Sequence, residues 1–341
     1  MTKTEAINLY TQDIYEIGEK ADRIRREFHQ DKVFFNSNAH LNPTNECVDT
    51  CKFCGFSAHR KNPNPYTMTL HVALKQVECA VKEGALEIHI VGAHNPKCNL
   101  DWYVQLFSEI KKQYPQLHIK ALTAAEVNYL ADLHQLSFKA VLEKMIQSGV
   151  DSMPGGGAEI FDEEVRRKIC KGKVDSCRWI DIHRHWHKLG KKSNCTMLFG
   201  HIESREHRID HLLRLQELQE ETNGFNAFIP LLFQTKNNFL NIQESPTGQE
   251  VLKTIAISRI LLHNIPHIKA YWATLGINVA MVAQEFGADD LDGTIQKESI
   301  QSASGSKSAQ GITKEELISQ IKNAGFIPIE RDTLYREIAR Y

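Results

Sequence analysis

Cys47, Cys51 and Cys54 lie within one stretch of eight residues, with the spacing C-x3-C-x2-C. This spacing constrains the chain more than any other feature, because three neighbouring thiols point to one metal centre. Thiolates hold iron–sulfur clusters, and a cluster of four irons bound by three cysteines keeps one iron without a protein ligand. An open metal position is typical of catalytic rather than structural sites. The spacing therefore predicts a [4Fe–4S] cluster with one iron open to substrate.

Two other uses of these thiols can be considered. A disulfide is disfavoured because three cysteines this close cannot all pair with one another, and because we expect no secretory signal in the first thirty residues, which are rich in acids and bases. Zinc is a real alternative, since His59 could complete a tetrahedral site with the three cysteines. Short zinc modules usually supply their ligands as two separated pairs, which favours the cluster.

The rest of the chain alternates short apolar runs with longer amphipathic stretches, a rhythm typical of βα units around a parallel sheet. Eight candidate strands span residues 34–42, 86–93, 118–123, 150–153, 193–199, 225–231, 267–273 and 288–291. Eight such units predict an α/β fold, a (β/α)8 barrel of the TIM type, with its active site at the carboxyl ends of the strands. We expect residues 1–341 to form a single domain, with a helical extension over about 1–30 and a C-terminal extension over about 310–341.

Two of these strands carry polar residues at every second position, which places one polar face in the barrel lumen. Asn36, Asn38 and Glu87 fall deep in the strands, where they could satisfy one another or contact a ligand. His40 and Asn42 fall at the mouth, next to the cysteine loop. A role at the site is therefore more strongly indicated for His40 and Asn42 than for the deeper residues.

Composition restricts the partners of the protein. The formal net charge is −1 and the pI is about 7.0, so no bulk electrostatic attraction draws the chain to nucleic acid or to anionic lipid. No apolar stretch reaches the ~18–20 residues that span a bilayer. We therefore expect a cytoplasmic protein with a small-molecule substrate, and neither a nucleic acid nor a membrane as partner.

Further candidate residues follow individual strands. Gly92 and Ala93 come after the second strand, and Glu126 after the third, where its carboxylate could accept hydrogen bonds from a ribose or an ammonium group, or could instead begin the next helix. His201 follows the fifth strand in Gly-His-Ile-Glu. The histidine-rich stretch from His183 to His187 is interpreted as a solvated helix surface, because it lacks the glutamate spacing of a zinc protease.

The cysteine spacing, with Phe53 before the third cysteine, resembles the signature of the radical S-adenosylmethionine (SAM) superfamily. That resemblance implies that the open iron is chelated by the amino and carboxylate groups of SAM, which is cleaved to methionine and a 5′-deoxyadenosyl radical. It also implies that Phe53, Gly92, Ala93 and Glu126 lie at the SAM site. Only one glycine of the usual pair stands after the second strand, which leaves the details of SAM binding open.

The resemblance extends nearly end to end. The run from Asn42 through the cysteines, Thr196-Met-Leu-Phe-Gly-His-Ile-Glu203 and Arg331-Asp-Thr-Leu-Tyr335 look like the menaquinone and deazaflavin branch of this superfamily, and most of all like the aminofutalosine synthase family. The sixth strand departs from that family, because it is followed by Gln234-Thr-Lys236 rather than by a histidine-proline pair.

Membership would imply addition of the 5′-deoxyadenosyl radical to 3-[(1-carboxyvinyl)oxy]benzoate, giving 6-amino-6-deoxyfutalosine and bicarbonate, with an electron donor such as flavodoxin or ferredoxin. Such a reaction needs anchors for two substrate carboxylates, and we expect His40, His201 and Arg208 to supply them. The nearest alternative is the dehypoxanthine futalosine cyclase or a related deazaflavin-branch enzyme. An alternative of another class is a non-catalytic barrel in which Cys47, Cys51, Cys54 and His59 hold zinc.

Overall fold

A computed structural model describes residues 1–58, 63–295, 299–306 and 311–341, and its centre is a curved parallel sheet. Seven strands pair side by side in the order β2-β3-β4-β5-β6-β7-β8. They are β2 (Asn38–Leu41), β3 (Glu87–Ile90), β4 (His118–Ala121), β5 (Ser152–Met153), β6 (Lys192–Phe199), β7 (Phe225–Leu232) and β8 (His267–Ile268). Every pairing within this sheet is parallel, as the alternation of strands and helices predicts.

Two further strands close the sheet into a ring. Strand β1 (Lys32–Asn36) leads directly into β2 across Ser37, so the two together occupy the first position of the barrel. Strand β9 (Asp290–Gly293) pairs in parallel with β1, and a single parallel bridge joins Lys269, just after β8, to Asp290. The predicted (β/α)8 barrel is therefore confirmed, with an irregular first strand and a weak closure between its seventh and eighth positions.

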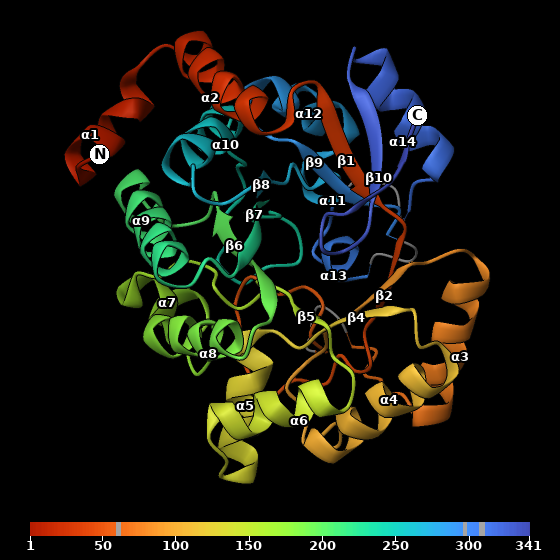
Figure 1. Cartoon of the computed structure of the whole chain (residues 1–341). Helices are drawn as coiled ribbons and strands as arrows, with labels where there is room; N and C mark the ends of the chain where they lie inside the picture. Colours follow the sequence, from red (N-terminus) through yellow and green to blue (C-terminus); the bar gives the residue numbers. More distant parts are fainter. Residues whose placement is uncertain (59–62, 296–298, 307–310) are drawn as a thin grey trace.

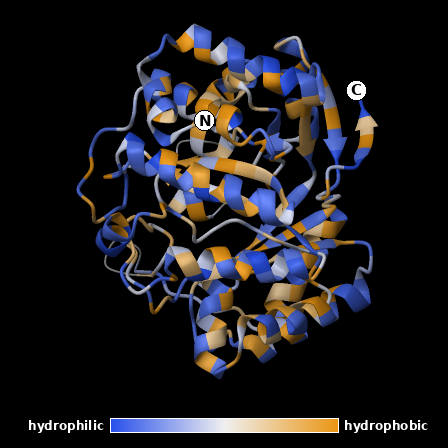
Figure 2. Ribbon diagram, turned by 60° about the vertical axis from the view of Figure 1, so that its left-hand side comes forward, coloured by the Kyte–Doolittle hydropathy of each residue, from blue (hydrophilic) through white to orange (hydrophobic). Residues whose placement is uncertain are grey.

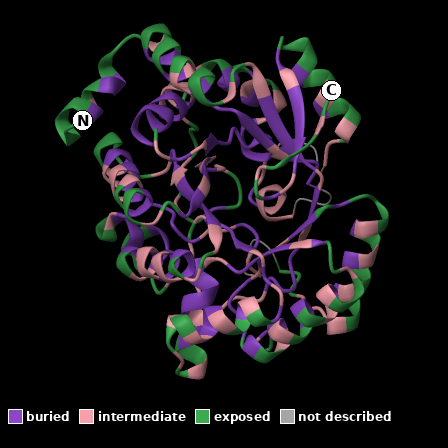
Figure 3. Ribbon diagram, in the orientation of Figure 1, coloured by how far each residue is buried: buried purple, intermediate pink, exposed green. Residues whose placement is uncertain are grey.

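The helices lie around the strands, as Figure 1 shows, and their exposed faces point outward in Figure 3. Figure 2 shows apolar and polar residues alternating along them, which is the pattern of helices that cover a core on one side. They are α1 (Lys3–Asn8), α2 (Ile14–His29), α3 (Leu70–Lys82), α4 (Leu100–Gln113), α5 (Ala124–His134), α6 (Phe138–Gln147), α7 (Glu163–Ile169), α8 (Ser176–Lys188), α9 (Arg205–Thr222), α10 (Gly248–Leu261), α11 (Trp272–Leu275), α12 (Ile277–Val282), α13 (Ile300–Ala303) and α14 (Lys314–Asn323). Among the described residues, none of these helices is long and apolar enough to cross a membrane.

The seventh strand is shorter than the sequence predicts. The expected strand 267–273 ends at Ile268, and Trp272 already begins the short helix α11. The indole Nε1 of Trp272 donates a hydrogen bond of 2.8 Å to the carbonyl oxygen of Gly293, at the end of β9. This contact turns the chain across the barrel instead of along it, which alternation of apolar residues could not reveal.

The C-terminal residues form a small second sheet with the first strand. Strand β10 (Ile327–Arg331) pairs in parallel with β1, and β11 (Glu337–Arg340) pairs antiparallel with β10. Figure 1 shows β10 and β1 side by side. Since β1 is the amino-terminal part of the first barrel strand, the C-terminal segment lies at the amino-terminal end of the barrel, opposite the loop that carries the cysteines.

His183 and His187 of α8 are buried, so their interpretation as a solvated surface is wrong, whereas His185 between them is partly exposed. His183 and His187 both contact the hydroxyl of Ser193 on β6, at 2.9 and 2.7 Å, and His187 also contacts Thr222 at 2.7 Å. The His187 ring packs directly against Gly224, just before β7. A Cβ atom at this position would lie 2.0 Å from the ring, so only glycine fits there. The i, i+4 spacing of His183 and His187 places them on one face of α8, but it does not show whether that face packs against the sheet.

Buried histidines make the stability of this fold depend on pH. Burial lowers the pKa of His211 to about 3, whereas an unfolded histidine titrates near ~6.5. Protons therefore bind the unfolded chain first, and stability is lost as the pH falls from about 6.5 toward 3. We expect His211→Gln, which can keep the donor to Thr196, to reduce the pH slope of the unfolding free energy by about 1.4 kcal/mol per pH unit near pH 5. Urea unfolding at several pH values measures the slope, and an unchanged slope would contradict this assignment.

Candidate active site

The cysteine loop begins at the carboxyl end of β2, and asparagine side chains fix its course. Asn42 donates a hydrogen bond of 2.8 Å to the carbonyl oxygen of Val91, at the end of the neighbouring β3. Asn45 accepts one of 2.8 Å from the N–H of Tyr66. These bonds tie both ends of the loop to the mouth of the barrel, which is where the sequence placed the cysteines.

All three thiols of the loop are partly buried and free of disulfides. The N–H of His94 donates to Cys47 Sγ at 3.4 Å, and the N–H of Ser57 donates to Cys54 Sγ at 3.4 Å. Burial raises the pKa of each thiol, so without a ligand the three are protonated, and binding of a metal cluster must release those protons. Three thiols with N–H donors aimed at two of them suit an iron–sulfur cluster, whose sulfurs accept such bonds.

Lys173 is a charged residue at this loop that sequence reasoning missed. Its Nζ lies 2.7 Å from the carboxylate of Glu159 and 5.6 Å from the centre of the Phe53 ring. Burial lowers the pKa of Lys173, but Glu159 and the Cys51 thiol raise it by more, so the net shift is well above its ordinary value. The lysine is therefore a fixed cation beside the cysteines. Neither its position after α7 nor its spacing from the cysteines gave a local signal.

One cavity runs from the cysteine loop into the barrel lumen. Four of the predicted site residues line it together with Cys54: His40, Phe53, Gly92 and Glu126. At the loop end it is also lined by Gly155, Gly156, Gly157, Glu159 and Lys173, and deeper in the lumen by Glu87, His89, Lys120, Lys269 and Asp292. The lumen thus holds a polar, charged chamber in place of the usual packed side chains of such barrels.

Glu126 combines the two roles that its position suggested. It is the third residue of α5, and its carboxylate accepts hydrogen bonds from the N–H and hydroxyl of Thr123, both at 2.8 Å, which caps the helix. Its other oxygen accepts from the N–H of Gly92 at 2.9 Å. Burial raises the pKa of Glu126. The residue lines the cavity and holds the loop after β3 in place.

Besides Cys47 and Cys51 of the cysteine loop, three predicted site residues are not among those that line the cavity. Ala93 is buried next to Gly92, and its N–H donates to the carbonyl oxygen of Thr44 at 3.1 Å. His201 lies 3.1 Å from Glu203, and Arg208 pairs with Glu203 and with Glu250, each at 2.7 Å. Both side chains are thus committed to contacts outside the cavity, and we do not include them in the substrate site proposed below. His59, the fourth ligand in the zinc alternative, lies outside the described residues.

Comparison with protein families supports what this geometry suggests. The model of the radical SAM superfamily matches residues 41–215, which contain the cysteine loop and strands β3 to β6. The chain belongs to the radical SAM superfamily. A second model, the CofH/MqnC C-terminal region, matches residues 222–340. The expected fold and the resemblance stated from the cysteine motif are confirmed at this level.

Three named relatives show which enzymes of the superfamily this chain is similar to. The chain is 41% identical to the aminodeoxyfutalosine synthase of Thermus thermophilus, over 96% of this chain and 89% of that protein. It is 38% identical to the aminodeoxyfutalosine synthase of Streptomyces coelicolor, over 100% and 91%. It is also 36% identical to 5-amino-6-(D-ribitylamino)uracil–L-tyrosine 4-hydroxyphenyl transferase 2 of Methanosarcina acetivorans, over 99% and 88%. Relatives with two different reactions are therefore similar over nearly the full length.

Solved structures confirm the fold. Methylornithine synthase superposes with a TM-score of 0.76 at 17% sequence identity, covering 96% of this chain and 94% of that chain. The hydrogenase maturase HydG of Carboxydothermus hydrogenoformans gives a TM-score of 0.75 at 14% identity, covering 98% and 77%. As a radical SAM enzyme, the chain uses a [4Fe–4S] cluster and SAM. The thiols of the loop and the cavity beside it fit these two groups.

Proposed function

We propose that this chain is an aminodeoxyfutalosine synthase of menaquinone biosynthesis. It would join the 5′-deoxyadenosyl group of SAM to the enol ether carbon of 3-[(1-carboxyvinyl)oxy]benzoate, with formation of 6-amino-6-deoxyfutalosine and release of bicarbonate. The observation that carries the proposal is the 41% identity to the Thermus enzyme of that name over 96% of the chain. The charged chamber beyond the cysteine loop supports it, because a substrate with two carboxylates needs buried donors.

In this proposal Cys47, Cys51 and Cys54 hold the cluster, which when bound supplies one electron for the reductive cleavage of SAM. The electron would come from a donor such as flavodoxin or ferredoxin. Lys173 is a buried cation beside the thiols and offers a partner for the carboxylate of SAM. Glu126 keeps the loop at Gly92 in place, where the backbone meets the cavity.

The barrel then positions the two reactants. Adenosyl group and alkene must meet at near-attack distance, because geometry of this kind can supply a large part of a rate enhancement. The cavity connects the cysteine loop with the deeper polar chamber, so a substrate held in the chamber faces SAM at the loop. His40 lines the cavity between them and is the one predicted substrate anchor that we retain.

Anaerobic turnover tests this function against its nearest alternatives. We expect reduced enzyme, SAM and 3-[(1-carboxyvinyl)oxy]benzoate to give an adenosine-containing adduct, detected by mass spectrometry with the adenosyl group labelled. Release of 5′-deoxyadenosine with a cyclised product from dehypoxanthine futalosine would instead indicate the cyclase. Turnover of tyrosine with 5-amino-6-(D-ribitylamino)uracil would indicate the reaction named for the Methanosarcina relative.

A further inference from the structure

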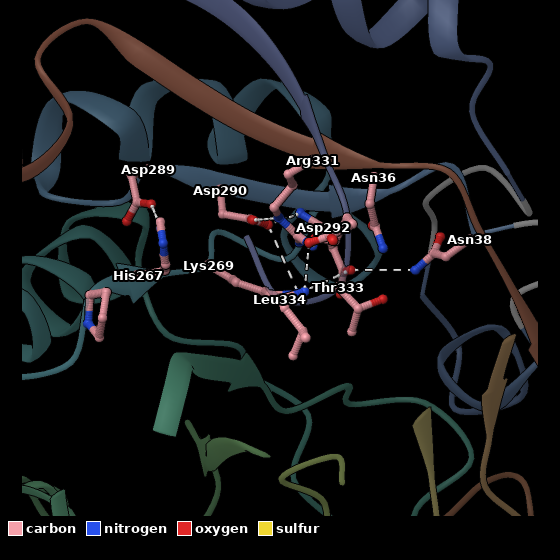
Figure 4. A network of polar contacts seen from close by, with 12 residues as sticks. Asn36, Asn38, His267, Lys269, Asp289, Asp290, Asp292, Arg331, Thr333 and Leu334 are labelled. Carbon is pink, nitrogen blue, oxygen red and sulfur yellow. Dashed lines mark hydrogen bonds and ion pairs between the residues drawn. The ribbon is translucent and has the colours of Figure 1, made fainter. Parts of the chain in front are cut away.

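The C-terminal segment 331–335 reaches the inside of the barrel from its amino-terminal end. Arg331 Nε lies 2.5 Å from a carboxylate oxygen of Asp290, and the hydroxyl of Thr333 donates a hydrogen bond of 2.6 Å to Glu87 Oε2. Asp290 and Glu87 are the first residues of β9 and β3. Figure 4 shows Arg331 and Thr333 next to the acidic residues of β9. The motif that sequence analysis recognised only by resemblance therefore lies behind the floor of the cavity, where it contacts Glu87.

The floor and the segment behind it contain three ion pairs of 3.1 Å or less. Glu87 pairs with Lys120 at 2.8 Å, and Asp292 pairs with Lys269 at 3.1 Å. The third is the pair of Asp290 with Arg331 described above. The side chains of Lys120 and Lys269 are 5% and 1% exposed. Lys269 Nζ also lies 3.9 Å from Asp290, so each cation has at least one carboxylate partner, and the two lysine ammonium groups are kept in the lumen.

These ammonium groups retain hydrogen-bond donors toward the cavity. An ammonium carries three N–H donors, and among the described residues Lys120 Nζ donates one bond, to Glu87, and Lys269 Nζ donates one, to Asp292. Both lysines line the cavity. His89 lines it as well, and its buried Nε2 has no hydrogen-bond partner in the part of the chain that the structure describes. The two ammonium groups are therefore available to an acceptor, and His89 offers a third nitrogen atom beside them.

Structural roles alone do not account for this arrangement. Several charges buried in a barrel lumen cost more free energy than apolar residues that pack there would, so their presence indicates a ligand. The backbone supports the same reading, because Asp292 adopts a φ of 72°, a left-handed conformation that costs free energy in a non-glycine residue and is concentrated at functional sites. That conformation accompanies the placement of its carboxylate beside Lys269.

We propose that Lys120 and Lys269 form the binding site for a carboxylate group of the substrate, and that the C-terminal segment positions them. Thr333 holds Glu87, which in turn holds Lys120. Arg331 holds Asp290, the more distant of the two carboxylate partners of Lys269. Thr333 and Arg331 are positioning residues, since neither is among the residues that line the cavity. A short charge-assisted bond from an ammonium to a carboxylate is among the stronger hydrogen bonds in proteins.

This inference rests on the proposed function only for the identity of the substrate, whose ring carboxylate would reach the floor while its alkene faces SAM. The subsite itself can be tested without turnover. Benzoate carries the same ring and carboxylate, and benzamide has the same shape without the charge. We expect the cluster-containing enzyme to bind benzoate at least about tenfold more tightly than benzamide in calorimetric titrations, as expected of one charge-assisted bond.

Variants separate binding from positioning. The double change Lys120→Met and Glu87→Gln removes a cation together with its partner, so no lone charge stays buried, and should weaken benzoate binding at least about tenfold. Thr333→Val should weaken it severalfold, and Thr333→Ser, which keeps the hydroxyl, should restore it. In turnover the Thr333→Val change should raise KM for the aromatic substrate more than it lowers kcat. Thermal unfolding checks that each variant is folded. If one is not, the double change Lys269→Met and Asp292→Asn, which again removes a cation with its closest partner, provides an independent test.

Several results would overturn the proposal. Equal affinity for benzoate and benzamide, or benzoate binding that is unchanged in folded Lys120 and Lys269 variants, would exclude a carboxylate site on these lysines. Competition between SAM and benzoate would assign the floor to SAM. If benzoate binds as expected but 3-[(1-carboxyvinyl)oxy]benzoate yields no adduct, the subsite stands and the proposed function fails.

Discussion

Cys54→Ala should abolish both the iron–sulfur cluster and the formation of product. Cys54 is one of three thiols in the loop, and it both lines the cavity and accepts the N–H of Ser57. A cluster held by three thiolates has no spare protein ligand, so loss of one should leave the cluster unbound or unstable. We expect iron and acid-labile sulfide of the anaerobically purified variant to fall to background, with no detectable adduct. Zinc in the wild-type protein, without sulfide, would contradict this assignment and favour the closed zinc site.

Cys170 provides the sharpest control for the open iron. It is buried at the end of α7, close enough to Cys51 for a thiolate there to raise the pKa of the Cys51 thiol. The two segments are joined by a hydrogen bond of 2.7 Å from the N–H of Lys52 to the carbonyl oxygen of Ile169. We expect Cys170→Ala to keep its cluster, as should Cys177→Ala at an exposed position. Loss of the cluster in Cys170→Ala alone would mean a fourth thiolate and no open iron.

The fold could be predicted because it depends on patterns that repeat along the chain. Each strand of the barrel is a short apolar run between amphipathic stretches, so their number and order follow from periodicity. Their ends could not be predicted, because they depend on partners far away in sequence. The contact of Trp272 with the end of β9 and the single bridge from Lys269 to Asp290 are such cases.

Site residues that stand in short sequence motifs could be predicted, whereas contacts between residues far apart in sequence could not. The three cysteines, Phe53 and Gly92 stand in recognisable motifs, and position in the barrel led to His40. Position also led to His201 and Arg208, but it could not show that their side chains turn to Glu203 and Glu250. A residue that follows a strand lies near the mouth of the barrel, but the direction of its side chain depends on partners that sequence position does not reveal.

Two residues whose contacts no local pattern predicted support the cavity. Lys173 reaches the cysteines from the segment after α7, and Thr333 reaches Glu87 across 246 residues of sequence. Both are ordinary polar residues in sequence, and only the packing of distant segments brings them to the site. The C-terminal motif was recognised by resemblance alone, and its contacts with the lumen supply a physical reason for it.

Asp289→Asn should produce the largest loss of stability in the described part of the barrel, away from the cavity. The Asp289 carboxylate accepts hydrogen bonds from Arg259 at 2.5 Å, from His267 at 2.5 Å and from the N–H of Ile268 at 2.8 Å. The side chains of Arg259 and Asp289 are both fully buried. The change leaves the guanidinium without a counter-charge, which costs about 3–5 kcal/mol for a buried pair. Urea unfolding of the reduced protein measures the difference.

The same cluster could be mistaken for a metal site. Atoms of His29, His267 and Asp289 lie within 4.8 Å of one another. Both oxygens of Asp289 already accept hydrogen bonds, and the positive Arg259 beside them disfavours a cation. We therefore interpret the cluster as an ionic tie between α10, β8 and the start of β9. Glu19→Gln on α2, which breaks an exposed pair with Arg23, is the matched control and should not measurably change the unfolding midpoint. The Arg259 guanidinium also donates to the carbonyl oxygens of Gly287, Ile265 and Pro266. An equally small effect of Asp289→Asn would show that these carbonyl partners satisfy the buried guanidinium alone.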